Sequence, residues 1–395
     1  MNHNIGISVY PDIRPLDEIK QYFALASKYG VSRVFSSMFS VEGTKEEVLA
    51  YFRELIDAAH QYNLKVSLDV NPFCFKHLDA SPNDLSVFAE IKADILRMDM
   101  DFGPEGDKQL IENPYGIQIE FSYSPKVAQS LVDLGVDPAS FYMCHNFYPQ
   151  RYTGMKWGRF KEINKEIKAI SRDIRLGAFV SSNNQNTHGV WDATDGLPTV
   201  EKLRDYPIDL QARILLATND VDDILIGNAY ASEEELKDLY EAVKAADVSP
   251  IKDPEPILKS LADHGFLKLD NPTKLIKVDL DKDILPVEEE VLFNFVPHLD
   301  MGDSSEWIWR SRLPRFKYSK PNQSIPPREF ECKMFEVGDV MIVNDNYKHY
   351  AGEIQIVKEP IINDGTRNRI GHIDADEYTI MELVQDSDMI KFLKR

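Results

Sequence analysis

The sequence predicts a (β/α)₈ barrel followed by a smaller β-rich domain, and three observations lead to this fold class. Over the first 245 residues, short apolar segments alternate with segments whose apolar residues recur at helical spacing, which is typical of parallel βα units. Eight such units fit the roughly 250 residues of a closed α/β barrel. After residue 246 the chain becomes rich in proline and then in short alternating segments.

The eight strands are expected where the apolar segments lie, each with a helical segment nearby. The predicted strands are 5–10, 32–39, 65–70, 95–100, 116–122, 141–146, 176–181 and 223–228. The predicted helices are 16–29, 45–62, 84–91, 125–134, 158–172, 199–204, 209–218 and 232–246. Gly30 ends the first of them, as glycine commonly does after a helix.

A doubly wound open sheet is the alternative fold for such a pattern. Open sheets of this class usually have five or six strands, and their first strand often leads into a glycine-rich phosphate turn. Here the first strand leads into YPDIRP, which contains no G-x-G-x-x-G motif. The number of units and this missing motif both favour the barrel.

The chain is expected to divide into a barrel (1–248), a connector (249–284) and a β domain (285–395). The connector has several prolines and one short helical segment. Turn signals such as Asn363-Asp364-Gly365 separate the apolar segments of the β domain. Its predicted strand segments are EVLFNFVPHL (290–299), KMFEVGDVMIVN (333–344), GEIQIVKEPII (352–362) and GHIDADEYTIMELV (371–384).

Composition excludes several classes of function. A net charge of -20 disfavours nucleic-acid binding, because neutralising phosphates requires clustered Lys and Arg. No apolar run approaches the roughly 20 residues that span a bilayer, and the N-terminus lacks the basic and apolar regions of a secretion signal. Cys74, Cys144 and Cys332 match no zinc or disulfide framework. We therefore expect a cytoplasmic protein without membrane or nucleic-acid partners, and its oligomeric state is left open.

The candidate site follows from the predicted fold, because α/β barrels bind ligands at the carboxyl ends of their strands. Four carboxylates lie at or near predicted strand ends: Asp12, Asp69, Asp99 and Glu120. Other polar or aromatic side chains there are predicted to bind substrate: Tyr10, Asn71, Arg97, Gln118, His145, Asn146, Tyr148, Ser181, Asn183 and Asn228. Trp191, in a loop after the seventh strand, is a further candidate for stacking on a sugar.

Converging carboxylates with neutral polar groups and aromatics suit glycoside hydrolysis, which needs one acid and one nucleophile or base. We take Asp99 and Glu120 as the principal pair, with Asp12 and Asp69 in reserve. Each acid alone could instead be a salt-bridged structural group, and His145 could be a neutral core histidine. A metal-dependent sugar-phosphate isomerase or epimerase is the alternative enzyme. No H-x-H follows the first strand and only one histidine ends a strand, so we predict neither metal nor cofactor.

Several motifs resemble those of the 6-phospho-N-acetylmuramidases over essentially the whole chain. They are ISVYPD (7–12), LRMDMDFG (96–103), IEFS (119–122), HNFYP (145–149), DGLPTVEK (195–202) and IWRSRLPR (308–315). The resemblance implies a (β/α)₈ barrel with a C-terminal cyclophilin-like β-barrel. It also implies a cytoplasmic enzyme of cell-wall recycling that hydrolyses the β-1,4 bond between N-acetylmuramic acid 6-phosphate and N-acetylglucosamine. A non-catalytic sensor of phosphorylated muropeptides is the alternative outside the enzymes.

A phosphorylated substrate requires local cations in so acidic a chain. Arg310, Arg312 and Arg315 form a dense basic stretch, and arginine suits bidentate phosphate contacts. We expect Arg310 and Arg312 to bind the substrate phosphate, with the second domain lying over the barrel mouth. A solvated charged loop is the alternative for these arginines. The barrel's own candidate is SSNNQN (181–186), because phosphate often binds near the loops after strands seven and eight.

Overall fold

The computed structural model describes residues 3–11, 13–38, 43–247, 256–268, 271–295 and 297–395. The chain splits into two compact units, Asn2–Val243 and Lys244–Arg395. The two units are considered one at a time below. Among the described residues, no helix is both long and apolar enough to cross a membrane.

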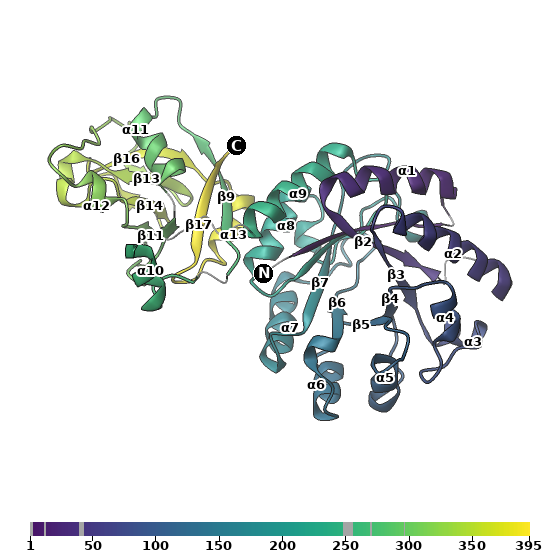
Figure 1. Ribbon diagram of the computed structural model, residues 1–395. Coiled ribbons are helices and arrows are strands. Elements are labelled where there is room, and N and C mark those ends of the chain that lie inside the picture. The colour runs from purple at the N-terminus through teal and green to yellow at the C-terminus, as the bar shows by residue number, and fades with distance from the viewer. Residues whose placement is uncertain (1–2, 12, 39–42, 248–255, 269–270, 296) are drawn as a thin grey trace. The chain divides into compact units, whose positions relative to one another are not determined.

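The first unit is a closed barrel of eight parallel strands, which confirms the predicted fold class. Figure 1 shows the strands surrounded by helices. Several predicted strands ran past their true carboxyl ends, because the polar residues there leave the strand. The strands are β1 Asn4–Ser8, β2 Val31–Ser37, β3 Lys65–Val70, β4 Ile95–Met98, β5 Gln118–Ser122, β6 Phe141–Cys144, β7 Arg175–Val180 and β8 Asp223–Ile226.

Local signals explain where the helices of the barrel unit begin. Thr44 and Glu47 form a capping box at the start of α2, in which each side chain accepts a hydrogen bond from the other residue's backbone N–H. The helices are α1 Leu16–Ala26, α2 Lys45–His60, α3 Pro72–His77, α4 Ser86–Glu90, α5 Pro104–Ile111, α6 Pro125–Asp133, α7 Trp157–Ile170, α8 Ile208–Ala217 and α9 Glu233–Asp247. Short 3₁₀ turns are η1 Ser27–Tyr29, η3 Pro138–Ser140, η4 Val190–Asp192 and η5 Glu201–Leu203.

Helices α3 and α5 were not predicted from the sequence, and the helix predicted at 199–204 is only the 3₁₀ turn η5. Both missed helices begin with a proline, which usually breaks a helix but is favoured in its first turn. Asn71 also caps α3, since its Oδ1 accepts hydrogen bonds from the N–H groups of Phe73 and Cys74.

The second unit contains a seven-stranded, barrel-like sheet in the order β10-β17-β9-β16-β13-β14-β11, and a two-stranded sheet of β12 and β15. The predicted β-rich domain is thereby confirmed, whereas its likeness to cyclophilin stays a prediction. The strands are β9 Lys274–Leu280, β10 His298–Leu299, β11 Ile308–Ser311, β12 Met334–Phe335, β13 Asp339–Val343, β14 Ile354–Val357, β15 Ile361–Ile362, β16 Arg367–His372 and β17 Met389–Lys394. The helical segments are α10 Pro256–Asp263, α11 Pro286–Glu289, η6 Glu290–Asn294, α12 Arg315–Tyr318, η7 Asp345–Tyr350 and α13 Ala375–Met381.

Two strand predictions in this unit were wrong. The segment 290–299 begins as the π-helical turn η6, which continues the preceding helix, and only its end enters the sheet. The segment 371–384 contains α13, whose N-cap Asp374 accepts hydrogen bonds from the N–H groups of Asp376 and Glu377. Strand β9 lies within the segment expected to be a connector, and it pairs with both β16 and β17.

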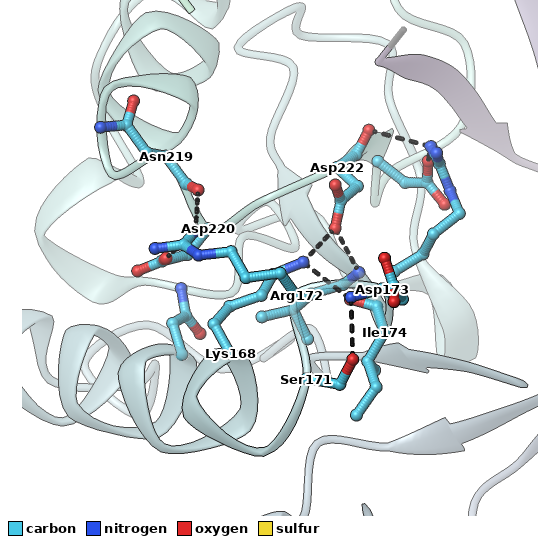
Figure 2. A network of polar contacts seen from close by, with 12 residues as sticks. Lys168, Ser171, Arg172, Asp173, Ile174, Asn219, Asp220 and Asp222 are labelled. Atoms are coloured by element: carbon cyan, nitrogen blue, oxygen red, sulfur yellow. Dashed lines mark hydrogen bonds and ion pairs between the residues drawn. The ribbon is translucent and has the colours of Figure 1, made fainter. Parts of the chain in front are cut away.

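A buried lysine ties α7 to the chain just before β8 (Figure 2). Lys168 Nζ donates to Asp222 Oδ2 at 2.6 Å and to the carbonyl of Ile174 at 2.7 Å. The same carboxylate oxygen accepts the N–H of Leu176 at the start of β7. One ion pair therefore joins an outer helix to two adjacent strands.

Replacing Lys168 with Met should destabilise the protein by about 3–5 kcal/mol, because Asp222 would lose the cation that compensates its partly buried charge. Chemical denaturation measures this loss. Lys165→Met is the matched control on the exposed face of α7 and should change stability by less than about 0.5 kcal/mol. Equal effects of the two substitutions would show that the ion pair contributes nothing specific.

Candidate active site

Arg97, on β4 and only 3% exposed, is the centre of the polar groups at the carboxyl ends of the barrel strands. Its Nη1 donates to Asp69 Oδ1 of β3 at 2.6 Å and lies 3.9 Å from Asp99 Oδ1, directly after β4. Its Nη2 donates to Asn146 Oδ1, which follows β6. The structure thus brings together four of the residues that the sequence proposed for the site.

The two carboxylates on Arg97 lie in different environments. The Asp69 side chain is 8% exposed, whereas that of Asp99 is 40% exposed. Burial raises the pKa of Asp69 to about 6, although Arg97 beside it acts in the opposite direction. A site with one carboxyl group that holds its proton near neutral pH and a second, more solvated one can separate acid from base roles.

The shared arginine also limits the separation of the two carboxylates. Asp69 Oδ1 and Asp99 Oδ1 both lie within 4 Å of one nitrogen atom, Arg97 Nη1. The distance between these two oxygens is therefore at most about 6.5 Å. Inverting glycosidases have carboxyl groups roughly 6.5–9.5 Å apart, so this maximum only reaches the lower end of their range. The spacing is compatible with the shorter separation of the retaining class.

Glu120 lies deeper in the barrel than predicted for a residue at the mouth. It is fully buried, and its Oε1 accepts from Nη2 of Arg33, on β2, across the barrel interior at 2.5 Å. Arg33 also donates to Ser67 Oγ and lies 3.7 Å from Asp223 Oδ2. The Glu120 carboxylate is thus held by a residue that faces the opposite end of the barrel from the mouth.

That opposite end holds a cavity of about 480 Å³, lined by Arg33 and by residues at or before the starts of several strands. Gln118, the first residue of β5, is among these lining residues. Because barrel enzymes place their ligand sites at the carboxyl ends, this position does not support the predicted role of Gln118 in binding substrate. The alternation of side chains along β5 had predicted on which face of the strand Gln118 lies, but not how far it lies from the barrel mouth.

His145 is a core residue and not a partner of a carboxylate. Its Nε2 hydrogen-bonds Asn164 Oδ1 of α7 at 2.6 Å. Its ring stacks on Tyr123 and packs against Phe160, each with 4.6 Å between ring centroids. Burial lowers the pKa of His145 to about 4, so the ring is neutral at pH 7. These contacts match the alternative of a neutral core histidine and do not support the predicted role of His145 in binding substrate.

The polar groups of the loop after β7 form hydrogen bonds with other residues of the barrel unit. The Ser182 hydroxyl and the Asn183 N–H both donate to the carboxylate of Glu235 in α9. The Asn228 side chain exchanges hydrogen bonds with the backbone of Ser182, and Ser181 Oγ accepts the N–H of Leu197. A carboxylate in the midst of these donors makes the loop a poor phosphate site.

The remaining predicted residues have mixed placements. The Tyr10 hydroxyl donates to the carbonyl of Gly227 at 2.5 Å, and Asn71 caps α3. The hydroxyl of Tyr148 contacts that of Tyr123 at 3.0 Å. Asp12 lies outside the described residues. The predicted roles of Arg310 and Arg312, in the second unit, stay predictions.

Of three aromatic residues in the loops after strands β6 to β8, the sequence had proposed Trp191 but not Tyr152 or Tyr230. Tyr152 and Trp191 are highly exposed, and both have a positive φ, as does Tyr230. Positive φ is unusual for bulky residues and occurs preferentially at ligand-binding sites. The rings of Tyr152 and Trp191 are exposed enough to stack on a sugar, whereas Tyr230 packs against Tyr22. Among the described residues, no group of three His, Cys, Asp or Glu could hold a metal ion.

Comparison with known proteins supplies the family. The family model described as "6-phospho-N-acetylmuramidase, N-terminal" matches residues 5–241, and the one described as "6-phospho-N-acetylmuramidase, C-terminal" matches residues 275–393. An uncharacterized B. cereus protein of known structure is 30% identical over 100% of both chains, with a TM-score of 0.82. A conserved Enterococcus faecalis protein of unknown function is 21% identical over 99% of this chain and 96% of its own, with a TM-score of 0.63, which shows a shared fold. No curated protein matches the chain.

The buried, neutral His145 predicts a specific loss of stability in acid. Its folded-state pKa lies below the ordinary value, so protons bind the unfolded chain more tightly. Stability should be intact above about pH 6.5 and should fall by about 2–4 kcal/mol from this group as the pH drops toward 4. Urea denaturation across this range should show a smaller acid-induced loss for His145→Gln than for the wild type.

Turnover at pH 7 by the folded His145→Gln variant should stay within a few-fold of wild type. His77→Gln removes an exposed histidine of α3 and should leave the acid dependence unchanged. An unchanged acid dependence in His145→Gln together with a large loss of turnover would instead return His145 to the active site.

Proposed function

The chain belongs to the 6-phospho-N-acetylmuramidase family of glycosidases, and on this premise we propose that Asp69 and Asp99 are its catalytic pair. The proposed substrate is N-acetylmuramic acid 6-phosphate linked β-1,4 to N-acetylglucosamine, and the products are the phosphorylated muramic sugar and N-acetylglucosamine. The observation that carries the proposal is the single guanidinium, Arg97, that binds both carboxylates at the barrel mouth. This pair replaces the combination of Asp99 with Glu120.

Asp69 suits the general acid. A glycosidase must protonate the leaving oxygen, and a carboxyl group with a pKa of about 6 holds a proton over the pH range just below neutrality. In the proposed step, the Asp69 proton moves to the glycosidic oxygen as its bond to the anomeric carbon breaks. The new Asp69 carboxylate is stabilised by Arg97 Nη1, which already lies 2.6 Å away.

Asp99 suits the nucleophile. Its side chain is the more exposed of the pair, so an anomeric carbon can approach it. Attack by Asp99 would form a glycosyl ester, and water activated by the Asp69 carboxylate would then release the sugar. Asn146 is held by Arg97 through its Oδ1, and we assign its amide N–H groups to a sugar hydroxyl or acetamido group.

Cell-wall recycling in the cytoplasm is the proposed setting. The three cysteines are all unpaired, and two of them are at least partly exposed, which suits a reducing compartment. A metal-dependent isomerase and a non-catalytic sensor of phosphorylated muropeptides remain the alternatives to hydrolysis. Incubating the protein with the disaccharide, with and without a chelator, separates the three. Cleavage that persists with the chelator supports the hydrolase, metal-dependent rearrangement supports the isomerase, and binding without turnover supports the sensor.

The two carboxylates should respond differently to the leaving group. On the disaccharide, Asp69→Asn and Asp99→Asn should each lower kcat by at least ~10²-fold. On an aryl glycoside of the phosphorylated muramic sugar, whose phenolate leaves without protonation, Asp69→Asn should retain most of its kcat/KM, because the glycosyl ester then forms without the acid. Its kcat should stay low, because release of the sugar still needs Asp69 to activate water. Asp99→Asn should stay impaired on both substrates. Steady-state kinetics with both substrates measure the contrast.

Glu120→Gln is the comparison variant for this experiment. It weakens the buried contact with Arg33 and should lower the melting temperature more than it lowers turnover of either substrate. The assignment of Asp69 is wrong if Asp69→Asn loses equal kcat/KM on both substrates while Glu120→Gln shows the aryl-selective rescue of kcat/KM.

The close spacing of the carboxylates predicts retention of configuration. Hydrolysis of the β-linked disaccharide should first release the β-anomer of N-acetylmuramic acid 6-phosphate, because two displacements at the anomeric carbon restore its geometry. Proton NMR of a reaction at high enzyme concentration resolves the two anomers before they equilibrate. Initial release of the α-anomer would show a single displacement by water and would remove Asp99 from the nucleophile's role.

A further inference from the structure

The second unit contains a cluster of three arginines, two of which pair with one buried glutamate. Glu353 is fully buried and directly precedes β14. It accepts from Arg310 Nε at 3.0 Å and Nη2 at 2.7 Å, and from Arg315 Nη1 at 3.4 Å. Arg312 lies between them in sequence and pairs with Asp303 at 2.9 Å. Two guanidinium groups are therefore fixed by one carboxylate from the interior side.

An aromatic ring further restricts these side chains. The Arg315 guanidinium lies 4.0 Å from the centre of the Tyr350 ring, and that of Arg310 lies 5.9 Å from it. Such contacts hold a guanidinium plane in place. Side-chain exposure is nonetheless 20% for Arg310, 19% for Arg315 and 40% for Arg312. The cluster is rigid on its inner side and open to ligand on its outer side.

The charges in the cluster do not balance. Three guanidinium groups face two carboxylates, those of Glu353 and Asp303, because Arg310 also lies 3.9 Å from Asp303. A fourth arginine, Arg367, contacts Gln355 but has its own acid, Asp364, at 3.2 Å. Counted over the residues that the structure describes, the cluster thus has one positive charge in excess, in a chain whose net charge is -20.

Another buried glutamate of the same unit shows the opposite balance. Arg328 binds the fully buried Glu288 at 3.0 Å and also pairs with Asp283 at 2.6 Å. There two carboxylates share one guanidinium, so no positive charge is left over. The contrast separates the arginine cluster from an ordinary structural network.

We propose that Arg310, Arg312 and Arg315 form an anion site for a phosphate monoester. Guanidinium groups bind phosphate oxygens through two parallel N–H donors, and the buried glutamate and Tyr350 orient those donors before the ligand arrives. The inference deepens the proposed function, on which it rests, because the proposed substrate carries a phosphate on its muramic sugar. The same chemistry would also bind a separate phosphate that acts as an effector.

Isothermal titration of the full-length protein with inorganic phosphate tests the site without any turnover. Wild-type protein should bind saturably, and Arg315→Gln and Arg310→Gln should each weaken binding by about ten- to hundred-fold. Arg315→Lys should also bind weakly, because it keeps the charge but loses the bidentate donors. Arg328→Gln is the matched control: it disrupts a comparable ion pair to a buried glutamate and should leave phosphate binding unchanged.

Absence of saturable phosphate binding by the wild type, or equal weakening in Arg328→Gln, would overturn the site whether or not the protein hydrolyses the disaccharide. Kinetics then distinguish the two sources of phosphate. If the ligand is the substrate's own phosphate, Arg315→Gln should raise KM for the phosphorylated disaccharide and not for the unphosphorylated one. If it is an effector, KM should be unchanged and the response of the rate to added phosphate should disappear.

Discussion

The need to pair arginines buried inside the barrel is the constraint on which the site depends. An isolated charge costs several kcal/mol to bury, and removing its partner destabilises a protein strongly. Arg97 therefore requires acceptors, and Asp69, Asp99 and Asn146 supply them from the ends of three strands. The same need deeper in the barrel binds Glu120 to Arg33. The stability of the interior and the geometry of the mouth consequently depend on the same contacts.

Depth in the barrel then separates side chains of the same chemical kind. Asp69 and Asp99 share one cation, but only Asp69 is removed from water, and burial raises its pKa to about 6. Glu120 is fully buried and is bound by Arg33, which lines the cavity at the end opposite to the mouth. In the proposed mechanism, aspartate thus supplies both the acid and the nucleophile, while a third carboxylate, Glu120, pairs with Arg33 in the interior. The roles of these carboxylates differ because their access to solvent differs, and no difference in their covalent structure is needed.

The sequence predicted the barrel because eight alternating units leave few other closed arrangements. It also brought Arg97, Asp69, Asp99 and Asn146 into one set, since strand ends meet at one mouth. The sequence could not show how deep Glu120 and Gln118 lie in the barrel. Period-two alternation gives the face of the strand on which a side chain lies, whereas depth depends on the tilt of the strands and on the register between them. His145 was ambiguous for a related reason: its partner Asn164 lies on α7, which no local pattern connects to β6. In the second unit, the apolar segment at Glu290–Asn294 fits a helical turn as well as a strand.

The central claim is that the scissile bond lies between Asp69 and Asp99. A crystal structure of the Asp99→Asn variant with the phosphorylated disaccharide bound tests it most directly. The account predicts an uncleaved substrate whose glycosidic oxygen lies about 2.6–3.2 Å from the Asp69 carboxyl group, with the anomeric carbon facing residue 99. A substrate bound away from Arg97, or one cleaved in the crystal by this variant, would contradict it.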